Sequence, residues 1–431
     1  MARRPSRHVS RGPGDIVPSV APVPRWSAWR TVIWFGLVSL AADMVYEGAR
    51  SLYGPLLAAL GAGATTVGLV TGAGEAMALV LRLVFGPLAD RTGSYWALTF
   101  LGYGLTAVCV PLLAVAPLLG GAGLAVAATL ILLERSGKAV RSPSKTALLA
   151  QVAASVGRGR GFGIHKALDQ TGAVAGPLLV AAVVALSARI WPGLAVLAIP
   201  GAIAMGLLAV IRWAVPDPGI YEEAPAAASA TPAGGVRGWV GAAVGAGLPQ
   251  SFIAYAVAAS LTTGGLVTYG LIGYHMAREH VVPIASVPLV YAGAMAMEAV
   301  AALVIGGVYD RIGGSTLYVV PLLVALVPAL VFTATPWVVL VGVAVWGFAF
   351  GIQDSTIKAL VAELVEAPRR ATAYGVFAGI QGAFALGGGV LAGWLYGRSV
   401  TELVVVVACT QALALVILAR TIPGARRRAR P

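Results

Sequence analysis

Apolar residues fill long, unbroken runs of this chain, and short polar or basic segments separate the runs. The runs are about 20 residues long without strict alternation, the pattern of helices that cross a bilayer core of about 30 Å. The pattern therefore predicts an all-α membrane protein. We place twelve transmembrane spans at residues 31–58, 64–87, 95–117, 119–148, 162–187, 191–212, 239–274, 284–307, 315–334, 336–362, 372–396 and 400–420.

The composition agrees with a bilayer environment. Apolar residues make up 58% of the chain and charged residues only 11%, whereas a soluble protein carries about a quarter charged residues. Backbone in contact with lipid must satisfy its own hydrogen bonds, which favours helices. We divide the chain into a disordered basic N-terminal arm at 1–28, a six-helix bundle at 29–213, a flexible cytoplasmic linker at 214–238, a second six-helix bundle at 239–421 and a basic tail at 422–431.

The basic charge is distributed unevenly between the two sides of these spans. The formal net charge is +13, and if both termini are cytoplasmic, only Arg189, Arg278 and Arg398 fall in segments on the opposite side. This asymmetry is the positive-inside rule. It predicts a multi-pass protein of the cytoplasmic (inner) membrane, with both termini in the cytoplasm. The basic arm and tail are expected to contact anionic lipid, and no nucleic-acid partner is expected.

Two copies of a short phrase indicate that the chain is built from two related halves. The first copy, GPLADRTG, begins at Gly86, and the second, GGVYDRIG, begins at Gly306. Each copy follows one apolar run and precedes another. Such a repeat of half-molecules is typical of membrane transporters. The phrase resembles the loop between helices 2 and 3 of the major facilitator superfamily and its counterpart between helices 8 and 9.

The resemblance implies a fold of two six-helix bundles and a gate in which the Asp-Arg pair latches the cytoplasmic ends of neighbouring helices. Here Ser94-Tyr95-Trp96 stands where the family has further basic residues, so the first latch would rest on two residues. We place Arg82 in this gate because it lies close to the phrase in sequence. The candidate gate residues are Arg82, Gly86, Asp90, Arg91, Gly93, Asp310, Arg311 and Gly313.

A second echo lies in the fifth and eleventh spans, where Gly176 matches Gly388. In the fifth span, Gly172, Gly176 and Pro177 resemble the core of the antiporter signature of efflux members of the superfamily. The glycine pair that continues the signature is replaced by Val180-Ala181. Small residues four apart also permit close helix packing, and proline kinks a helix, so generic packing is the alternative interpretation.

Charged residues inside the spans are costly and mark candidate functional sites. Asp43, Glu47 and Arg50 fall within an arc of roughly 60° on the first helix, at about 100° per residue. They form either a structural ion pair or a substrate or proton site. Because Arg50 can take one acid as its partner, the other acid is expected to titrate.

The fourth span is predicted to be one long helix. Glu134, Lys138, Arg141 and Lys145 share one face, and Arg135 resembles the helix-4 arginine of many superfamily members. We expect this face to line a water-filled cavity; the alternative is a helix that ends at residue 133. The remaining candidates are Asp169 and Gln170 in the fifth span, Asp354 and Lys358 in the tenth and Gln381 in the eleventh.

No catalytic motif and no metal-ligand spacing stands out, and Cys109 and Cys409 lie in separate apolar runs. We therefore expect neither an enzyme nor a metal site, and no cofactor: a proton gradient would supply the energy. Parts of the fourth and fifth spans resemble bacterial permeases labelled as efflux proteins. The sequence favours a monomeric secondary transporter that exports a small organic solute, with Asp43 or Glu47 carrying the proton and Arg135, Lys138 and Arg141 binding substrate. Uptake of an anionic metabolite, a lipid flippase and a non-transporting membrane sensor are the alternatives.

Overall fold

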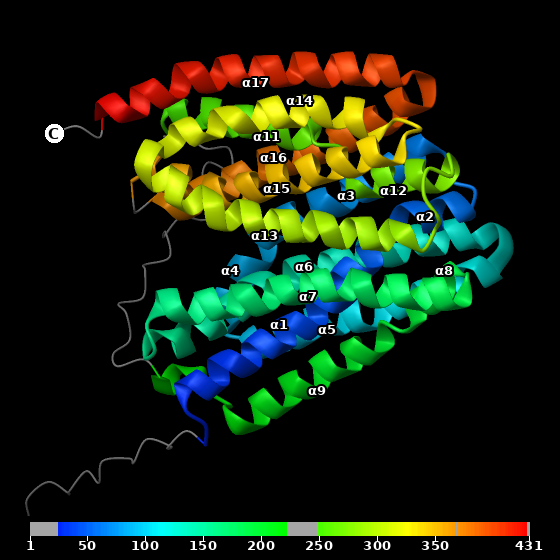
Figure 1. The fold of residues 1–431 in the computed structure, drawn as a ribbon. Helices are drawn as coiled ribbons and strands as arrows, with labels where there is room; N and C mark the ends of the chain where they lie inside the picture. The colour runs from blue at the N-terminus through cyan, green and yellow to red at the C-terminus, as the bar shows by residue number, and fades with distance from the viewer. Residues whose placement is uncertain (1–24, 222–247, 367–368, 429–431) are drawn as a thin grey trace, which may run out of the picture.

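The computed structural model describes residues 25–221, 248–366 and 369–428 (Figure 1). Most of the predicted N-terminal arm, most of the linker and the end of the basic tail lie outside these residues. The side chains of Asp310 and Lys358 also lie outside the description. Helix α9 ends at Ala214, and in the segment that follows it the Tyr221 hydroxyl donates to the carbonyl of Trp26, just before the first helix, at 2.8 Å.

Helices make up both halves of the molecule. The first half contains α1 (Ala28–Arg50), α2 (Tyr53–Ala59), α3 (Ala64–Val80), α4 (Arg82–Thr92), α5 (Tyr95–Leu112), η1 (Leu113–Ala122), α6 (Gly123–Ala154), α7 (Arg158–Ser187), α8 (Ile190–Ala195), α9 (Ala198–Ala214) and η2 (Pro218–Tyr221). The second half contains α11 (Gln250–Gly265), α12 (Tyr269–Arg278), α13 (Ser286–Ile312), η3 (Gly313–Tyr318), α14 (Val319–Val331), α15 (Pro336–Leu364), α16 (Arg370–Arg398) and α17 (Val400–Arg428).

The described residues contain no strand, and eleven helical segments are long and apolar enough to cross a membrane. One segment, Tyr95–Ala154, holds both α5 and α6. The backbone leaves helical geometry between them at Gly120, which has φ 54° and ψ −128°. Helix α6 then continues without interruption past the charged positions of the fourth span, as predicted. The all-α membrane architecture predicted from the apolar runs is confirmed.

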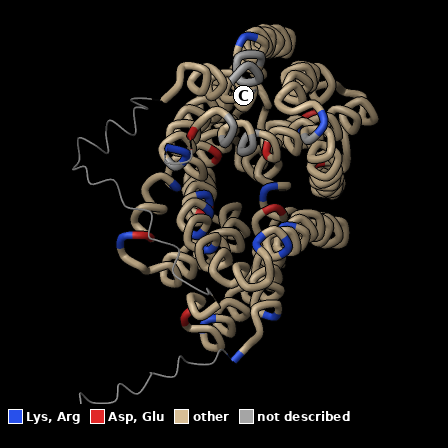
Figure 2. The backbone as a smooth tube through the Cα atoms, turned by 90° about the vertical axis from the view of Figure 1, so that its left-hand side faces the viewer, with Lys and Arg blue, Asp and Glu red and all other residues tan. Residues whose placement is uncertain are grey.

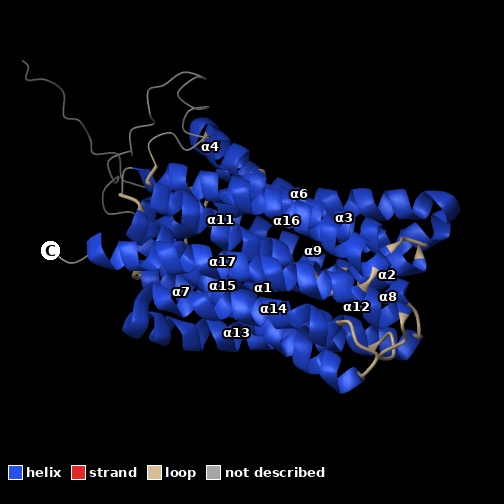
Figure 3. Cartoon of the chain, turned by 90° about the horizontal axis from the view of Figure 1, so that it is seen from above, coloured by secondary structure: helices blue, strands red, loops and turns tan. Residues whose placement is uncertain are grey.

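The two bundles meet where α2 and α3 contact α12, where α3 contacts α16 and where α7 contacts α13. Glycines allow the close approach. A Cβ on Gly54 of α2 would collide with the backbone of Gly270 in α12, and a Cβ on Gly68 of α3 would collide with Gly389 in α16. We call the end of the molecule that holds α2 and α12 the α2 end. The opposite end is the α4 end, where α4 projects from the body of the molecule (Figure 3).

The internal repeat is visible in the geometry of both halves. Gly93 ends α4 and Gly313 ends α13, each with φ 62°, a conformation that glycine adopts without strain. In the first half, Gly176 of α7 lies against the backbone of α1 at Met44. In the second half, Gly388 of α16 lies against Gly264 of α11 in the same way. The matched glycines of the sequence are therefore matched packing positions in the fold.

Candidate functional site

Many of the charged positions lie along the seam between the two bundles when the molecule is seen from the α4 end (Figure 2). Arg50, in the last turn of α1, bridges two carboxylates within the first bundle. Its Nη2 atom lies 2.6 Å from Glu75 Oε1 of α3, and its Nη1 atom lies 3.6 Å from Glu47 Oε2. The predicted pairing of Glu47 with Arg50 on one face of the first helix is therefore present.

Arg135 of α6 joins the same cluster. Its Nη2 atom lies 3.5 Å from Glu75 Oε1, and its Nε atom lies 3.7 Å from Glu134 Oε2. Glu75 thus holds two guanidinium groups from two helices. We call Glu47, Arg50, Glu75, Glu134 and Arg135 the buried ionic network; it ties α1, α3 and α6 together in the interior of the first bundle.

Tyr46 lies at the centre of this network. Arg50 and Arg135 both donate hydrogen bonds to its hydroxyl oxygen. Above its ring, the Lys138 Nζ atom lies 3.8 Å from the centroid and the Arg135 guanidinium carbon 4.6 Å from it. Cations placed over an aromatic face are attracted by the ring quadrupole, more strongly where water is excluded. A single buried side chain therefore organises three of the cations.

The charged residues of α6 lie in two different surroundings, and the first of these is the contact with α5. Glu134 is fully buried and accepts hydrogen bonds from Tyr53 and Thr106, each at 3.4 Å. Arg141 is buried beside it, donates to Thr106 at 2.7 Å and lies over the ring of Tyr103. These two residues pack against α5, so this part of the face does not line a water-filled cavity. Tight packing against α5 was not apparent from the spacing of the charges.

Further along α6, Lys145 contacts a second polar group, which lies between α1, α6 and α7. Lys145 donates to Ser39 Oγ at 3.2 Å, and the same hydroxyl lies 2.8 Å from His165 Nε2. His165 is buried. His165 is therefore a packed side chain between α7 and α1.

Asp43 of α1 and Asp169 of α7 are neighbouring acids whose carboxyl groups act on each other. Four charged groups act on Asp43: Glu47 of its own helix, Lys138 and Lys145 of α6, and Asp169 of α7. Asp169 also lies 3.4 Å from the Nζ atom of Lys166, whose side chain is 56% exposed. Asp43 is thus the acid of the first helix that Arg50 leaves without an ion pair, as the sequence suggested.

Two hydrogen bonds connect these clusters to the second bundle. The hydroxyl of Tyr291 in α13 donates to Glu47 Oε2 at 2.5 Å. The side-chain amide of Gln170 in α7 donates to the carbonyl of Met295, one turn further along α13, at 3.0 Å. The buried ionic network is therefore linked to the interface along which the two bundles would have to move.

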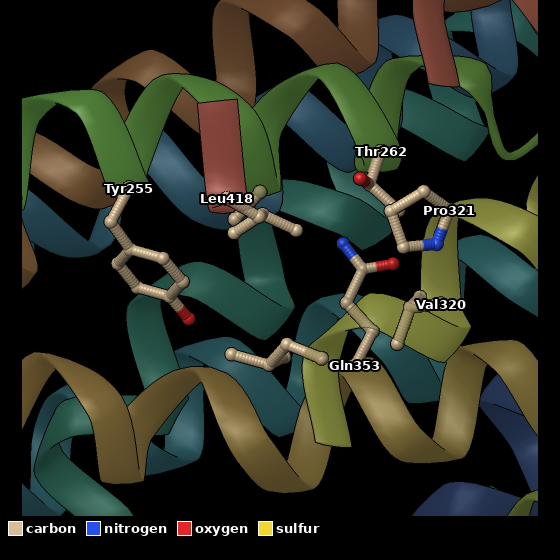
Figure 4. Close-up of a pocket in the computed structure, with 8 residues that line it drawn as sticks. Tyr255, Thr262, Val320, Pro321, Gln353 and Leu418 are labelled. Atoms are coloured by element: carbon tan, nitrogen blue, oxygen red, sulfur yellow. The ribbon is translucent and has the colours of Figure 1, made fainter. Parts of the chain in front are cut away.

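The polar groups of the second bundle are mostly uncharged. Thr263 Oγ1 accepts hydrogen bonds from the side-chain amides of Gln353 and Gln381, so the predicted site residue Gln381 lies in a cluster of α11, α15 and α16. Beside it, Tyr255, Thr262 and Gln353 point into a small pocket within the bundle (Figure 4). The pocket has room for about one water molecule. It is too small to hold an organic solute.

The predicted gate residues lie at the α4 end. Asp90 Oδ1 accepts a hydrogen bond at 3.0 Å from the hydroxyl of Tyr95, which stands where the family pattern has a basic residue. Arg91 and Arg311 are exposed. Gly86 faces Pro143 of α6. The pairing of Asp310 lies outside the described side chains, so the second latch stays a prediction.

Arg82 does not contact Asp90, although the sequence placed it in the gate. The charged groups that act on it are Glu75 and Arg141 of the first bundle and Asp354 of the second. Asp354 itself is exposed on α15, and its predicted partner Lys358 lies outside the described side chains. Arg82 therefore belongs to the surroundings of the buried ionic network.

Several residues of the site were not among those predicted from the sequence. Tyr46 and Arg50 are separated by four positions on one helix, a spacing that could have indicated the tyrosine as a partner. Glu75 carries the general signal of an acid inside a predicted span, whereas Tyr291 has no signal because its partner lies on another helix. Within the described residues, no group of three or more His, Cys, Asp or Glu side chains is arranged to hold a metal ion.

The second half of the chain, residues 251–431, matches the family model for the Major Facilitator Superfamily. An uncharacterized protein of Mycobacterium bovis is 49% identical over 396 residues, which cover 92% of this chain and 93% of the relative. An uncharacterized protein of Mycobacterium tuberculosis matches equally well. An uncharacterized MFS-type transporter of Methanocaldococcus jannaschii is 28% identical over 150 residues, 35% of this chain and 36% of that protein.

The fold is shared with solved transporter structures of low sequence identity. The nucleoside transporter NupG has a TM-score of 0.68 at 14% identity, over 91% of this chain and 98% of that one. The peptide transporter POT in complex with sulfate has a TM-score of 0.71 at 15% identity, over 94% of this chain and 96% of that one. These likenesses concern the arrangement of the helices.

Proposed function

This chain belongs to the Major Facilitator Superfamily, and on that premise we propose that it exports a small organic solute in exchange for protons. Family membership makes it a secondary transporter of a membrane rather than an enzyme. The proposal adds the coupling ion, the direction and the residue that carries the proton. Alternating access would occur by movement of the two bundles against each other.

The juxtaposition of Asp43 and Asp169 is the observation that carries the proposal. The two carboxyl groups belong to α1 and α7, which pack against each other, and each acts on the other. Neighbouring like charges disfavour the doubly ionised state. In the proposed mechanism this pair takes up one proton between two helices of the first bundle.

The surroundings of this pair suggest how the proton leaves. Lys138 and Lys145 of α6 act on Asp43, and Lys166 lies beside Asp169. Movement of Lys138, Lys145 or Lys166 toward the two carboxyl groups favours the state in which both acids are ionised. The proton then leaves the pair. Glu47 is the less suitable carrier, because it is already held by Arg50 and by the hydroxyl of Tyr291.

The proposed topology has twelve spans with both termini in the cytoplasm of a monomer in the inner membrane. The helical segment that contains both α5 and α6 supports the twelfth span. The basic distribution of the sequence supports the orientation. The close glycine contacts of α2 with α12 hold the two bundles together at the α2 end.

Export is the part of the proposal that rests on the fifth-span motif. Gly172 and Gly176 both lie against the backbone of α1, so close packing alone accounts for these two glycines. Uptake is therefore the second candidate, and cations without partners near Tyr46 favour an anionic substrate for either direction.

A growth panel tests the direction and the coupling residue together. Bacteria that lack their main exporters would express the chain, its Asp43→Asn variant or the control Asp217→Asn, and meet toxic cations, antibiotics, metals and antimetabolites. Asp217 lies in an exposed turn after α9, where it accepts a hydrogen bond from Gly219. We expect resistance to one compound class with the wild type and the control, and a loss of that resistance with Asp43→Asn. Sensitisation by the wild type would contradict export and indicate uptake.

A further inference from the structure

Arg82 and Lys138, two cations in the surroundings of the buried ionic network, form no ion pair with any carboxylate of that network. We propose that Arg82 of α4 and Lys138 of α6, with the hydroxyl of Tyr46, bind an anionic group of the transported solute. The group would be a carboxylate or a tetrahedral oxyanion of the phosphate type. This inference rests on the proposed transport function and names the substrate class of that function.

The carboxylates of the network are already occupied by other cations. Glu75 is shared by Arg50 and Arg135, and Glu134 accepts from two hydroxyl groups besides its contact with Arg135. Glu47 is held by Arg50 and Tyr291. None of these acids forms an ion pair with Arg82 or Lys138.

Arg82 and Lys138 lack ordinary partners within the described part of the chain. No hydrogen bond or ion pair reaches the ammonium group of Lys138, which rests 3.8 Å from the centroid of the Tyr46 ring. The Arg82 Nε atom is buried and has no acceptor among the described residues. A buried donor without an acceptor costs about 1–3 kcal/mol, and more when it is charged. An incoming anion would remove this cost.

The hydroxyl of Tyr46 supplies a third donor at the same place. Its oxygen accepts from Arg50 and Arg135, and its own proton has no acceptor among the described residues. Phenol, ammonium and guanidinium groups are all donors that suit the oxygens of a carboxylate or phosphate. These donors on α1, α4 and α6 have no acceptor within the described residues.

The position of Arg82 would connect binding to bundle movement. Asp354 of α15 acts on Arg82 from the second bundle. An anion bound to the guanidinium would compete with this attraction across the seam. Anion binding and the approach of the two bundles would therefore both act on Arg82. Such a shared side chain is required if binding is to be coupled to bundle movement.

Equilibrium binding of simple oxyanions tests the inference without any transport. The purified full chain in detergent would be titrated with sodium sulfate or inorganic phosphate at constant ionic strength, with chloride as the balancing anion, while its thermal unfolding is recorded. A ligand that binds the folded state raises Tm in a saturable way. We expect a saturable rise for the wild type and at least about a tenfold weaker apparent affinity for Arg82→Gln and Lys138→Gln, since a lost charged hydrogen bond is worth about 1.5–3 kcal/mol.

Matched controls separate a lost site from a general loss of charge. Arg398→Gln removes a guanidinium that is exposed and paired with Glu402, and it should titrate like the wild type. Lys138→Arg keeps the positive charge and should therefore still bind sulfate. This variant separates the loss of the charge from a loss of stability in Lys138→Gln. Identical titrations for the wild type, Arg82→Gln and Lys138→Gln would overturn the inference, as would a wild type without a saturable response.

The outcomes are distinct from those of the growth panel. A chain that binds sulfate through Arg82 and Lys138 but confers no Asp43-dependent phenotype would contradict the proposed proton coupling alone. A chain with the expected phenotype whose Arg82→Gln variant binds sulfate unchanged would contradict the anion site alone.

Discussion

Tyr46 shows how much of the site depends on one neutral side chain. Its hydroxyl accepts hydrogen bonds from two arginines, and its ring lies under a lysine. Without it, several like charges would meet in the interior with fewer groups to solvate them. The residue thus performs the role that water has for charges at a surface.

Replacing Tyr46 with Phe should therefore destabilise the folded chain. The substitution keeps the ring but removes the acceptor of Arg50 and Arg135, and a buried charged donor left unsatisfied costs about 1–3 kcal/mol. We expect a lower Tm in detergent for Tyr46→Phe. The control is Tyr95→Phe, which removes an exposed hydrogen bond to Asp90 and should have a small effect. Equal Tm values for both variants would show that the tyrosine hydroxyl does not support the network.

Helices of this molecule are positioned by glycine contacts as much as by apolar burial. The apolar runs predicted where the helices lie, because a bilayer imposes their length and backbone pairing. The same runs did not predict that α1 ends at Arg50 before the separate helix α2, or that α3 ends before Arg82. Those breaks depend on packing against other helices. They place Arg82 near the network rather than in the gate, which explains why sequence spacing assigned it differently.

Alanine substitutions at two glycines, Gly176 and Gly206, distinguish the effect of close packing on stability from the effect of helix propensity. Gly176 of α7 lies against the backbone of α1 at Met44, whereas Gly206 of α9 has open space around it. Alanine is about 0.8–1.0 kcal/mol more favourable than glycine in a helix interior, so Gly206→Ala should raise Tm or leave it unchanged. Gly176→Ala should instead lower it, because overpacking typically costs about 1–3 kcal/mol. The two predictions are checked by measuring the Tm of both variants. A gain in Tm for Gly176→Ala would contradict the close packing of α7 against α1.

At the scale of the whole molecule, ionisable groups and bundle contacts occupy the same seam. The carboxyl pair of Asp43 and Asp169 lies in the first bundle, and the Tyr291 hydroxyl connects the neighbouring network to the second. Composition and the repeated phrase were sufficient to predict two bundles in a membrane. The pairings across the seam could not be predicted, since they join residues far apart in the sequence and depend on which state the bundles adopt.

The most direct test of the account is a current measurement on proteoliposomes adsorbed to a solid support. Compounds selected by the growth panel would be applied to vesicles that contain the wild type, Asp43→Asn or the control Asp217→Asn, at several pH values. We predict a compound-dependent proton current for the wild type and the control. With Asp43→Asn this current should be absent, while exchange of labelled compound across the membrane continues. A proton current that persists unchanged in Asp43→Asn, or transport by the wild type without proton movement, would contradict the account.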